Sequence, residues 1–563
     1  MKTRNWNYDT WTPWTQQSAP LYLTLTLNPS FAPLRKYFGT PLFHSLIVFE
    51  HGSATWIFRP DEAAALGQRM IDYLQVPAHR NAFEDEVAAS LVSLESALIR
   101  AMSEANQTHH SAPSLLSEFR ALEAAYTRFY RLAAFIEPVQ VAAQRLLTVR
   151  IQATADSLAL STGADSREIA ASAYALDEES YAANIDRSLR DIASSLVKET
   201  ATQAGLRDEI SGLQSEKDVS RKRFKAAEVV KLLEKRETET SHLICRHIEM
   251  YSWSDNNYAR CFDLTATDVV LKVSNYGPPL VAHETLRTEI AKSEANRARG
   301  QELKTLLLPQ LSVYEANVLA IHDLVGARLL DTRKRVVLKT NGVFTHLLSA
   351  IARRLDLAVE DLIFLLPQEL DAVVRSPDRY VKRFALRKEA FLVYQADFSV
   401  LDEEAFEGIV DFEPHGDPYI AEGEAMVDEI FSRLSDRLNI LVGKPASGDE
   451  IQGFTAFYHF DTPRMTGTVA VIRDPATDII PPGSILVAAS TTPDYMSAIH
   501  RCSAIVTDWG GQTSHAAITA RELGKPCIIG TNYGSFSLRN GETVELDFEH
   551  GVVRRQVVQG AES

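Results

Sequence analysis

Residues 508–531 read DWGGQTSHAAITARELGKPCIIGT, a pattern of strand end, glycine turn, helix and second strand. An apolar run directly before this stretch predicts a buried strand. Gly510 and Gly511 predict a tight turn, and residues 516–523 are a short run of helix-forming types. Gly524 and Pro526 then end the helix before the apolar residues 527–529. We therefore expect a strand–turn–helix–strand unit of an α/β sheet.

His515 falls near the first turn of this predicted helix, directly after Thr513 and Ser514, which are good N-cap residues. Backbone N–H groups at a helix start favour an anion, and glycines allow the backbone to approach a phosphate closely. The same field disfavours protonation, so the imidazole should stay neutral and able to take up a phosphoryl group covalently. Taken alone, a histidine at this position more often caps a helix in an ordinary α/β layer.

The whole string resembles the phosphohistidine swivelling domain of the phosphoenolpyruvate-utilising enzymes. That family includes pyruvate phosphate dikinase, phosphoenolpyruvate synthase, the first enzyme of the bacterial sugar phosphotransferase system and rifampin phosphotransferase. The resemblance implies that His515 is the phosphorylated residue and that the turn before it holds the phosphate. Arg521 either contacts the phosphate or ties the helix to the sheet. The matching positions are Gly510, Gly511, Thr513, Ser514, His515, Ala516, Ala517, Ala520, Arg521, Gly524, Pro526 and Gly530.

The composition is that of a folded multidomain protein without a nucleic-acid surface. The chain has 563 residues, of which 45% are hydrophobic and 23% charged, and its net charge of −16 argues against general nucleic-acid binding. No apolar run is long enough for a membrane span, and no signal peptide is evident. Its four cysteines show no CxxC spacing, which is typical of reduced thiols in a cytoplasmic protein.

The pattern along the chain predicts a large, mainly α-helical body with a small N-terminal β/aromatic region and a C-terminal α/β swivelling phosphohistidine domain. In the N-terminal region, the alternation at 21–27 and the apolar runs 46–49 and 54–58 predict short strands. The predicted ranges are 1–60 for a strand and aromatic segment packed on the body, 61–445 for the helical domain, 446–450 (ASGDE) for a hinge, and 451–558 for the swivelling domain.

A second, weaker resemblance covers residues 300–400, which look like the helical region before the swivelling domain in rifampin-phosphotransferase-like proteins. It rests on Arg328, Arg333 and Arg335, and on the segment EDLIFL at 360–365, which precedes Glu369 and Leu370. Two further arginines, Arg383 and Arg387, follow one helical turn apart. Either these are surface arginines of a helical bundle, or they hold an anionic ligand. The candidate substrate-binding residues are Arg328, Arg333, Arg383 and Arg387.

The sequence lacks recognisable modules for a phosphoryl donor. Residues 1–60 show no glycine-rich phosphate cradle, and a (β/α)₈ barrel for phosphoenolpyruvate would need ~250 residues. We therefore expect one component of a split, dikinase-like phosphotransferase. A separate ATP-grasp protein would carry Mg-ATP and phosphorylate His515, and the helical domain would bind a small-molecule acceptor. No cofactor and no metal site are expected in this chain itself.

Two alternatives stay open. The chain could be a phosphocarrier or regulatory protein without an acceptor of its own. It could also be a non-catalytic binding module that retains the histidine loop as a scaffold.

Overall fold

A computed structural model describes most of the chain as two compact units whose segments alternate along the sequence. The first unit comprises Met1–Arg150, Asn256–Cys261 and Ser312–Ser447, and the second comprises Ile151–Asp255, Phe262–Leu311 and Gly448–Ser563. This grouping crosses the domain ranges suggested by the sequence, which stay predictions; residues 446–449 of the expected hinge lie outside the described part. The described residues are 12–23, 45–50, 53–175, 180–216, 218–257, 261–274, 283–394, 419–429, 432, 450–458, 462–473, 475, 478, 480–492, 495–510 and 514–556.

The first unit contains an antiparallel sheet with the strand order β1-β3-β2-β4-β5. The predicted strands at 46–49 and 54–58 are confirmed as the paired strands β2 and β3. The expected strand at 21–27 is wrong in its described part, because residues 20–23 form a helical turn. The sequence did not predict β4 and β5, which join the sheet from far along the chain. The bounds are Thr12–Gln17 (β1), Ser45–Glu50 (β2), Ser53–Phe58 (β3), Ala390–Tyr394 (β4) and Tyr419–Glu422 (β5).

The helices of the first unit start at recognisable caps. Ser111 accepts a hydrogen bond from the backbone of Ser114, and Ser312 and Glu315 form a capping box. The helices are α3 (Pro60–Leu74), α4 (Pro77–Ala105), α5 (Ala112–Ala133), the start of α6 (Ile136–Thr162), α14 (Val313–Ile321), the π-helix η2 (His322–Arg328), α15 (Leu329–Leu355), α16 (Val359–Leu362), α17 (Leu370–Arg375) and α18 (Val381–Glu389), with short 3-10 turns at η3 (Pro367–Glu369) and η4 (Pro377–Arg379).

The second unit contains the other helices, and their apolar stripes agree with the sequence pattern. On α8, Ile185, Leu189, Ile192 and Leu196 recur at helical spacing and are buried. The longest of these helices, α13, begins at His283. The bounds are Ser166–Ser172 (α7), Tyr181–Thr202 (α8), Ala204–Ser215 (α9), Val219–Glu234 (α10), Glu239–Tyr251 (α11), Ala266–Ser274 (α12), His283–Leu307 (α13) and Leu308–Gln310 (η1).

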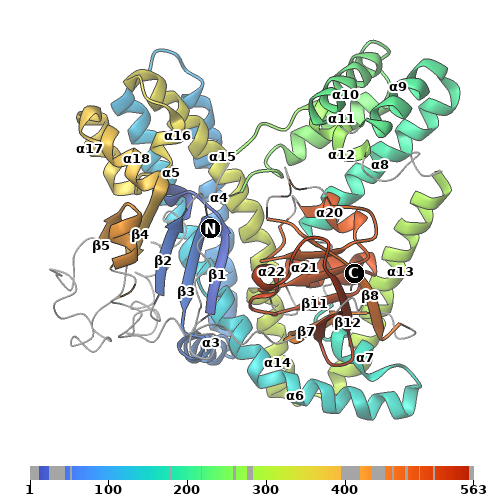
Figure 1. Ribbon diagram of the computed structural model, residues 1–563. Helices are drawn as coiled ribbons and strands as arrows, with labels where there is room; N and C mark the ends of the chain where they lie inside the picture. Colours follow the sequence, from blue (N-terminus) through green and yellow to red (C-terminus); the bar gives the residue numbers. More distant parts are fainter. Residues whose placement is uncertain are drawn as a thin grey trace, which may run out of the picture. The chain divides into compact units, whose positions relative to one another are not determined.

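The C-terminal part of the second unit is built around an eight-stranded mixed sheet with the order β6-β13-β12-β8-β9-β10-β11-β7 (Figure 1). The central strands β8, β9, β10 and β11 run parallel, and antiparallel strands flank them. The bounds are Glu450–Gln452 (β6), Phe454–Phe457 (β7), Arg464–Val471 (β8), Ile485–Ala488 (β9), Ala504–Thr507 (β10), Cys527–Ile529 (β11), Thr543–Asp547 (β12) and Val552–Arg555 (β13), with helices α20 (Met496–Arg501), α21 (His515–Leu523) and α22 (Gly534–Ser537).

Both faces of this sheet are covered, which explains why the central strands are continuous apolar runs. One face packs against α20 and α21 through residues such as Ile499, Ala516 and Ala520. The other face forms a second core that includes Val506 and Leu546. The expected fold class is confirmed in its coarse form, as a mainly helical body with a C-terminal α/β region.

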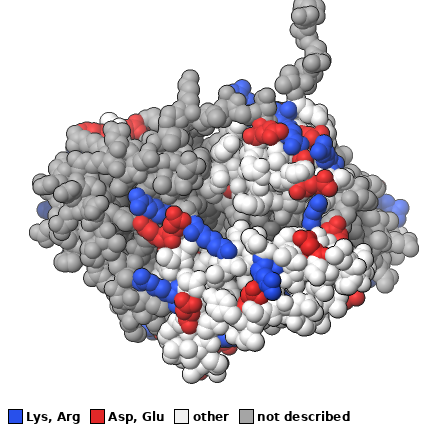
Figure 2. All heavy atoms as spheres, turned by 90° about the horizontal axis from the view of Figure 1, so that it is seen from below, with Lys and Arg blue, Asp and Glu red and all other residues white. Residues whose placement is uncertain are grey.

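Charged residues of both signs are interspersed on the surface drawn in Figure 2, where described lysines and arginines lie beside acidic residues. No helix within the described ranges is both long enough and apolar enough to cross a membrane.

Candidate active site

Three loops meet at the carboxyl edge of the parallel strands β9, β10 and β11. The backbone N–H of Asp508 donates to the carbonyl of Ala488 at 3.1 Å, which joins the loop after β10 to the end of β9. The N–H of Thr531 donates to the carbonyl of Thr507 at 3.1 Å, which joins the loop after β11 to the end of β10. Ligands of α/β sheets bind at this kind of edge, outside the carboxyl ends of the strands.

The helix α21 starts at this edge, and His515 is its first residue. Ser514 is the N-cap, as its residue type predicts, and its hydroxyl accepts a hydrogen bond from the backbone of Ala517 at 3.3 Å. Gly524 ends the helix in a left-handed conformation. His515 therefore lies at the start of a capped helix, as the sequence predicts.

The imidazole of His515 is only 5% exposed, and its orientation is fixed from a neighbouring loop. Its Nδ1 lies 2.9 Å from the hydroxyl oxygen of Thr491, which follows β9. Thr491 is itself buried. Sequence reasoning missed Thr491, because it lies 24 positions before His515. Only its place in the loop after β9, a strand of the same sheet, could have indicated it.

Glycine is required at position 510 by the local backbone conformation. Its φ of +129° is a conformation that residues with a side chain rarely adopt, and a Cβ on it would lie 2.6 Å from the side chain of Ser514. The backbone at Gly510 therefore lies close against Ser514, the N-cap of α21. The other two residues expected to hold a phosphate here, Gly511 and Thr513, lie outside the described residues.

Asp508 anchors the start of this turn and was also missed as a site residue. Its fully buried carboxylate accepts hydrogen bonds from the Thr531 hydroxyl at 2.9 Å, and from the backbone N–H of Ser535 at 2.9 Å. The Ser535 hydroxyl donates to it as well. Burial raises the pKa of Asp508 to about 6, although these hydrogen bonds and the backbone of Gly534 oppose the shift.

Arg521 follows His515 on α21 by a little less than two turns, so its Cα is ~9 Å from that of His515 along the helix axis. Burial lowers the pKa of Arg521 to about 10, and the neighbouring Cys527, Glu522 and Tyr174 partly oppose that change. Cys527 starts β11 and Tyr174 follows α7. These neighbours favour the interpretation in which Arg521 ties the helix to its surroundings, and its role toward a phosphate stays a prediction.

The candidate arginines Arg383 and Arg387 lie in the first unit, where carboxylates surround them. Arg387 is fully buried, and its guanidinium donates to Glu369 at 2.5 and 2.7 Å and to Glu422 at 2.7 Å. Arg383 donates to Glu422 at 2.6 Å. Hydrogen bonds and charges from Arg383 and Arg387 outweigh the effect of burial and lower the pKa of Glu422. This geometry favours a structural role, and anion binding by these arginines stays a prediction.

The other two candidate arginines differ from each other. Arg333 is buried, donates to Glu137 at 2.9 Å and lies over the ring of Tyr130 at 5.8 Å. Arg328 is exposed at the end of the π-helix η2. The structure therefore groups Gly510, Ser514 and His515 at one sheet edge, while all four arginines belong to the other unit.

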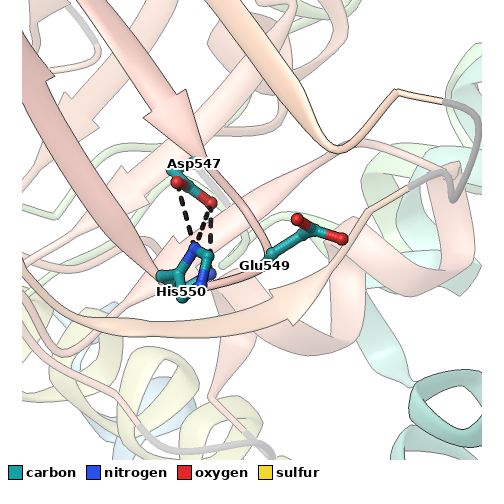
Figure 3. Close-up of side chains that lie close together, drawn as sticks. All are labelled: Asp547, Glu549 and His550. Carbon is teal, nitrogen blue, oxygen red and sulfur yellow. Dashed lines mark hydrogen bonds and ion pairs between the residues drawn. The ribbon is translucent and has the colours of Figure 1, made fainter.

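One group of described residues has the composition of a metal site. It consists of Asp547, Glu549 and His550, at the turn between β12 and β13 (Figure 3). The imidazole Nδ1 of His550 lies 3.0 Å from the carboxylate of Asp547. Arg554 also donates to this carboxylate, at 2.9 Å. Burial alone would raise the pKa of Asp547, but hydrogen bonds from Arg554 and His550 lower it to about 2. An arginine already neutralises this carboxylate, so the group favours an ion-pair network over a cation site.

Comparisons with known proteins agree on the region around this site. Residues 480–551 match the family described as the mobile domain of PEP-utilising enzymes. A phosphoenolpyruvate synthase of Pyrococcus furiosus is 46% identical over 94 residues, which are 16% of this chain and 12% of that protein. An uncharacterized phosphotransferase of Bacillus subtilis, YvkC, is 28% identical over 246 residues, which are 43% of this chain and 26% of that protein.

Among solved structures, the holo-form of aconitase X from Thermococcus kodakaraensis covers 20% of this chain and 100% of that chain, with 18% identity and a TM-score of 0.16. That similarity is too low to carry an argument. This chain spans only a small part of the length of the curated relatives named above. The matched segment 480–551 nevertheless contains Thr491, Asp508, Gly510, Ser514 and His515. Within the C-terminal α/β region, residues 480–551 therefore match the mobile-domain family of the PEP-utilising enzymes, and the proteins similar to this chain include phosphoenolpyruvate synthases and a phosphotransferase.

Proposed function

We propose that this chain is a component of a phosphotransferase in which His515 carries the phosphoryl group. The observation that supports this most directly is the position of His515 at the start of α21, with Nδ1 2.9 Å from the Thr491 hydroxyl. A helix start at the carboxyl edge of a parallel sheet favours an anion, and a fixed neutral imidazole is a suitable nucleophile.

In the proposed first step, Nδ1–H of His515 donates to Thr491, and this tautomer leaves the lone pair on Nε2. Nε2 attacks the phosphorus of the donor, an N–P bond forms, and the P–O bond to the departing phosphate breaks. Backbone N–H groups at the start of α21 would stabilise the charge on the transferred group. In the second step an acceptor oxygen attacks the phosphorus, the N–P bond breaks, and the imidazole returns to its neutral form.

We propose that the donor is Mg-ATP on a separate ATP-grasp protein, and that the acceptor is a small molecule bound by the helical part of this chain. The resemblance to dikinase-like proteins supports this division of labour by analogy only. Mg²⁺ would then belong to the nucleotide of the partner.

The alternative of a phosphocarrier without an acceptor of its own is favoured by one observation. Three of the four arginines that we expected to hold the acceptor are engaged by carboxylates, in the pairs of Arg333 with Glu137 and of Arg383 and Arg387 with Glu422. An acceptor that binds the isolated chain in equilibrium dialysis against labelled candidates would exclude the carrier alternative.

The carrier role itself can be tested without the partner. The purified chain is treated with labelled phosphoramidate, a small donor that phosphorylates reactive imidazoles. We expect label at His515 that is lost in acid and stable in base, and no label at this position in His515→Ala. Labelled ATP and Mg²⁺ alone should give no label. If the parent chain takes up no label at His515, or if ATP alone labels it rapidly, the corresponding part of the proposal is wrong.

A further inference from the structure

Asp508 holds together two of the three loops that form the His515 site. Its carboxylate accepts hydrogen bonds from the Thr531 hydroxyl and from the backbone N–H of Ser535, each at 2.9 Å, and the Ser535 hydroxyl donates to it as well. Thr531 follows β11, and Ser535 lies in α22. One side chain from the loop after β10 thus fixes the segment that follows β11, and these hydrogen bonds form the Asp508 connection.

The backbone around Asp508 strengthens this connection. The N–H of Asn532 donates to the carbonyl of Asp508 at 3.0 Å, and Asn532 adopts a left-handed conformation with a φ of +63°. A Cβ on Gly534 would lie 2.7 Å from the hydroxyl oxygen of Thr531 and 3.1 Å from the Asp508 carboxylate, so glycine is needed for α22 to start this close. The segment 531–535 is therefore folded tightly around Asp508.

The loop after β11 also lies beside the backbone that leads to His515. Gly510 comes two residues after Asp508. A Cβ on Gly530, at the start of the loop after β11, would lie 3.9 Å from the carbonyl oxygen of Gly510. The backbone at Gly510 in turn lies close against Ser514, the N-cap of α21. A shift of the loop after β11 would therefore reach the start of α21.

The groups that donate to Asp508 are all neutral. They are two hydroxyls and backbone N–H groups, and no lysine, arginine or histidine pairs with this carboxylate within the described ranges. The carboxylate is therefore held by hydrogen bonds and not by attraction to a cation. It brings no positive charge that could attract a phosphoryl group, so its effect on the His515 site has to come from the position of the loops.

We propose that Asp508 is a positioning residue of the carrier site. By joining the segment 531–535 to the start of the loop after β10, it keeps the backbone before His515 in the conformation that receives the phosphoryl group. In this role Asp508 acts through the loop backbone. This inference rests on the proposed function and extends the site from His515 to the loop after β11.

Two substitutions at Asp508 separate the connection from the charge. Asp508→Ala removes every side-chain acceptor, and it should slow phosphoramidate labelling of His515 by up to about a hundredfold, the cost of a ~1 Å displacement. Asp508→Asn keeps one oxygen for Thr531 and for the N–H of Ser535, and its amide can donate to the Ser535 hydroxyl. It should label at nearly the parent rate. Equally slow labelling in both variants would overturn the proposal, because the asparagine retains the connection.

The connection can also be broken from the loop after β11. Thr531→Val together with Ser535→Ala removes both hydroxyls and leaves Asp508 unchanged. We expect labelling of His515 to slow roughly tenfold, the effect of ~1.4 kcal/mol on a barrier. Added to Asp508→Ala, the same pair should slow labelling by less than about twofold more, since residues of one hydrogen-bond network are not additive. Effects that multiply would overturn the proposal, because they would show independent contributions.

The matched control is Asp547→Ala. Asp547 is as fully buried as Asp508, and it accepts hydrogen bonds from the backbone N–H of His550 and from Arg554 at the turn between β12 and β13. Its loss should lower the free energy of unfolding in urea, but labelling of His515 should stay at the parent rate. An equal fall in labelling in this control would overturn the positioning role, since general destabilisation would then explain both variants.

A second measurement does not depend on phosphoryl transfer. Amide hydrogen exchange of the peptide with residues 508–515 reports local opening of the loop after β10. Under native conditions it should be roughly tenfold faster in Asp508→Ala, as the loss of about one net hydrogen bond implies, and unchanged in Asp508→Asn and Asp547→Ala. A parent chain without phosphoramidate label would count against the proposed function, whereas unchanged exchange in Asp508→Ala would overturn the connection.

Discussion

The His515 site and the cluster around Arg387 were both candidate anion sites in the sequence, yet the structure builds them in opposite ways. Around His515, the loops contribute backbone N–H groups, a glycine turn and hydroxyls at a helix start. Around Arg387, two carboxylates, Glu369 and Glu422, take up the hydrogen bonds of a fully buried guanidinium. The first arrangement favours an incoming anion, and the second already contains its anions.

This difference shows that the residue type alone does not identify an anion site. A buried arginine must be neutralised, so the deeper it lies, the more completely its own chain supplies the counter-charges. A helix start offers only partial positive charge and can stay without a counter-ion. The following predictions test this contrast, from the largest expected effect to the smallest.

Arg387→Met should have the largest effect on stability. It leaves Glu369 and Glu422 buried without their main cation, and breaking a buried ion pair costs about 3–5 kcal/mol. Urea unfolding of the chain should show this loss, while phosphoramidate labelling of His515 under native conditions should be unchanged. Arg383→Met is the matched control, because Arg383 pairs with the same carboxylates but is 38% exposed, so its loss should cost much less. Equal costs for the two variants would contradict the contrast.

Local signals in the sequence were sufficient for the order of strand, helix and second strand, and for His515 at the helix start. Ser514, Gly510 and Gly524 each act through their own backbone or the next turn, and such signals can be seen in a short window. Thr491 could not be found in this way, because its contact depends on which strands are neighbours in the sheet. The pairing of β2 with β4 likewise joins residues more than 300 positions apart.

The arginines were misleading for a related reason. Glu369, Glu422 and Arg387 come together only when α18 and β5 are in place, so the sequence shows the cations without their partners. The expected strand at 21–27 relied on alternation over a few residues, and a short pattern of this kind does not outweigh packing in the folded chain.

Gly510→Ala should affect both stability and labelling. Its φ of +129° disfavours any side chain, and the added Cβ would meet Ser514 at 2.6 Å, so we expect a loss of about 1–3 kcal/mol and weaker labelling of His515. Gly483→Ala is the control, because Gly483 has a φ of +78° with nothing within 4 Å of an added Cβ. The control should lose stability without losing label. If both variants label alike, the contact with Ser514 does not shape the site.

Asp508→Asn should change how stability depends on pH. The folded-state pKa of Asp508, about 6, lies above the ordinary value of 3.8, so the folded chain binds this proton more tightly than the unfolded chain. The stability of the parent relative to the variant should therefore fall as the pH rises from about 4 to about 6, and stay constant above that range. Asp547→Asn should show the opposite sign at lower pH, because the pKa of Asp547 is lowered. A difference for Asp508 that rises with pH would contradict the burial effect.

Thr491→Val should have the smallest effect on stability and a specific effect on reactivity. Valine has nearly the shape of threonine, so the loop after β9 should keep its packing, and loss of one hydrogen bond costs about 1 kcal/mol. The Nδ1 of His515 would lose the hydroxyl that orients the imidazole in the proposed first step, and we expect phosphoramidate labelling to slow about tenfold, the effect of ~1.4 kcal/mol on a barrier. Thr491→Ser keeps the hydroxyl and should label at nearly the parent rate. If valine and serine label alike, Thr491 only fills space beside the imidazole. If the valine variant labels more slowly and the serine variant does not, the Thr491 hydroxyl is a positioning group. The His515 site then depends on a residue from a second loop, whereas the Arg387 cluster depends on its carboxylates.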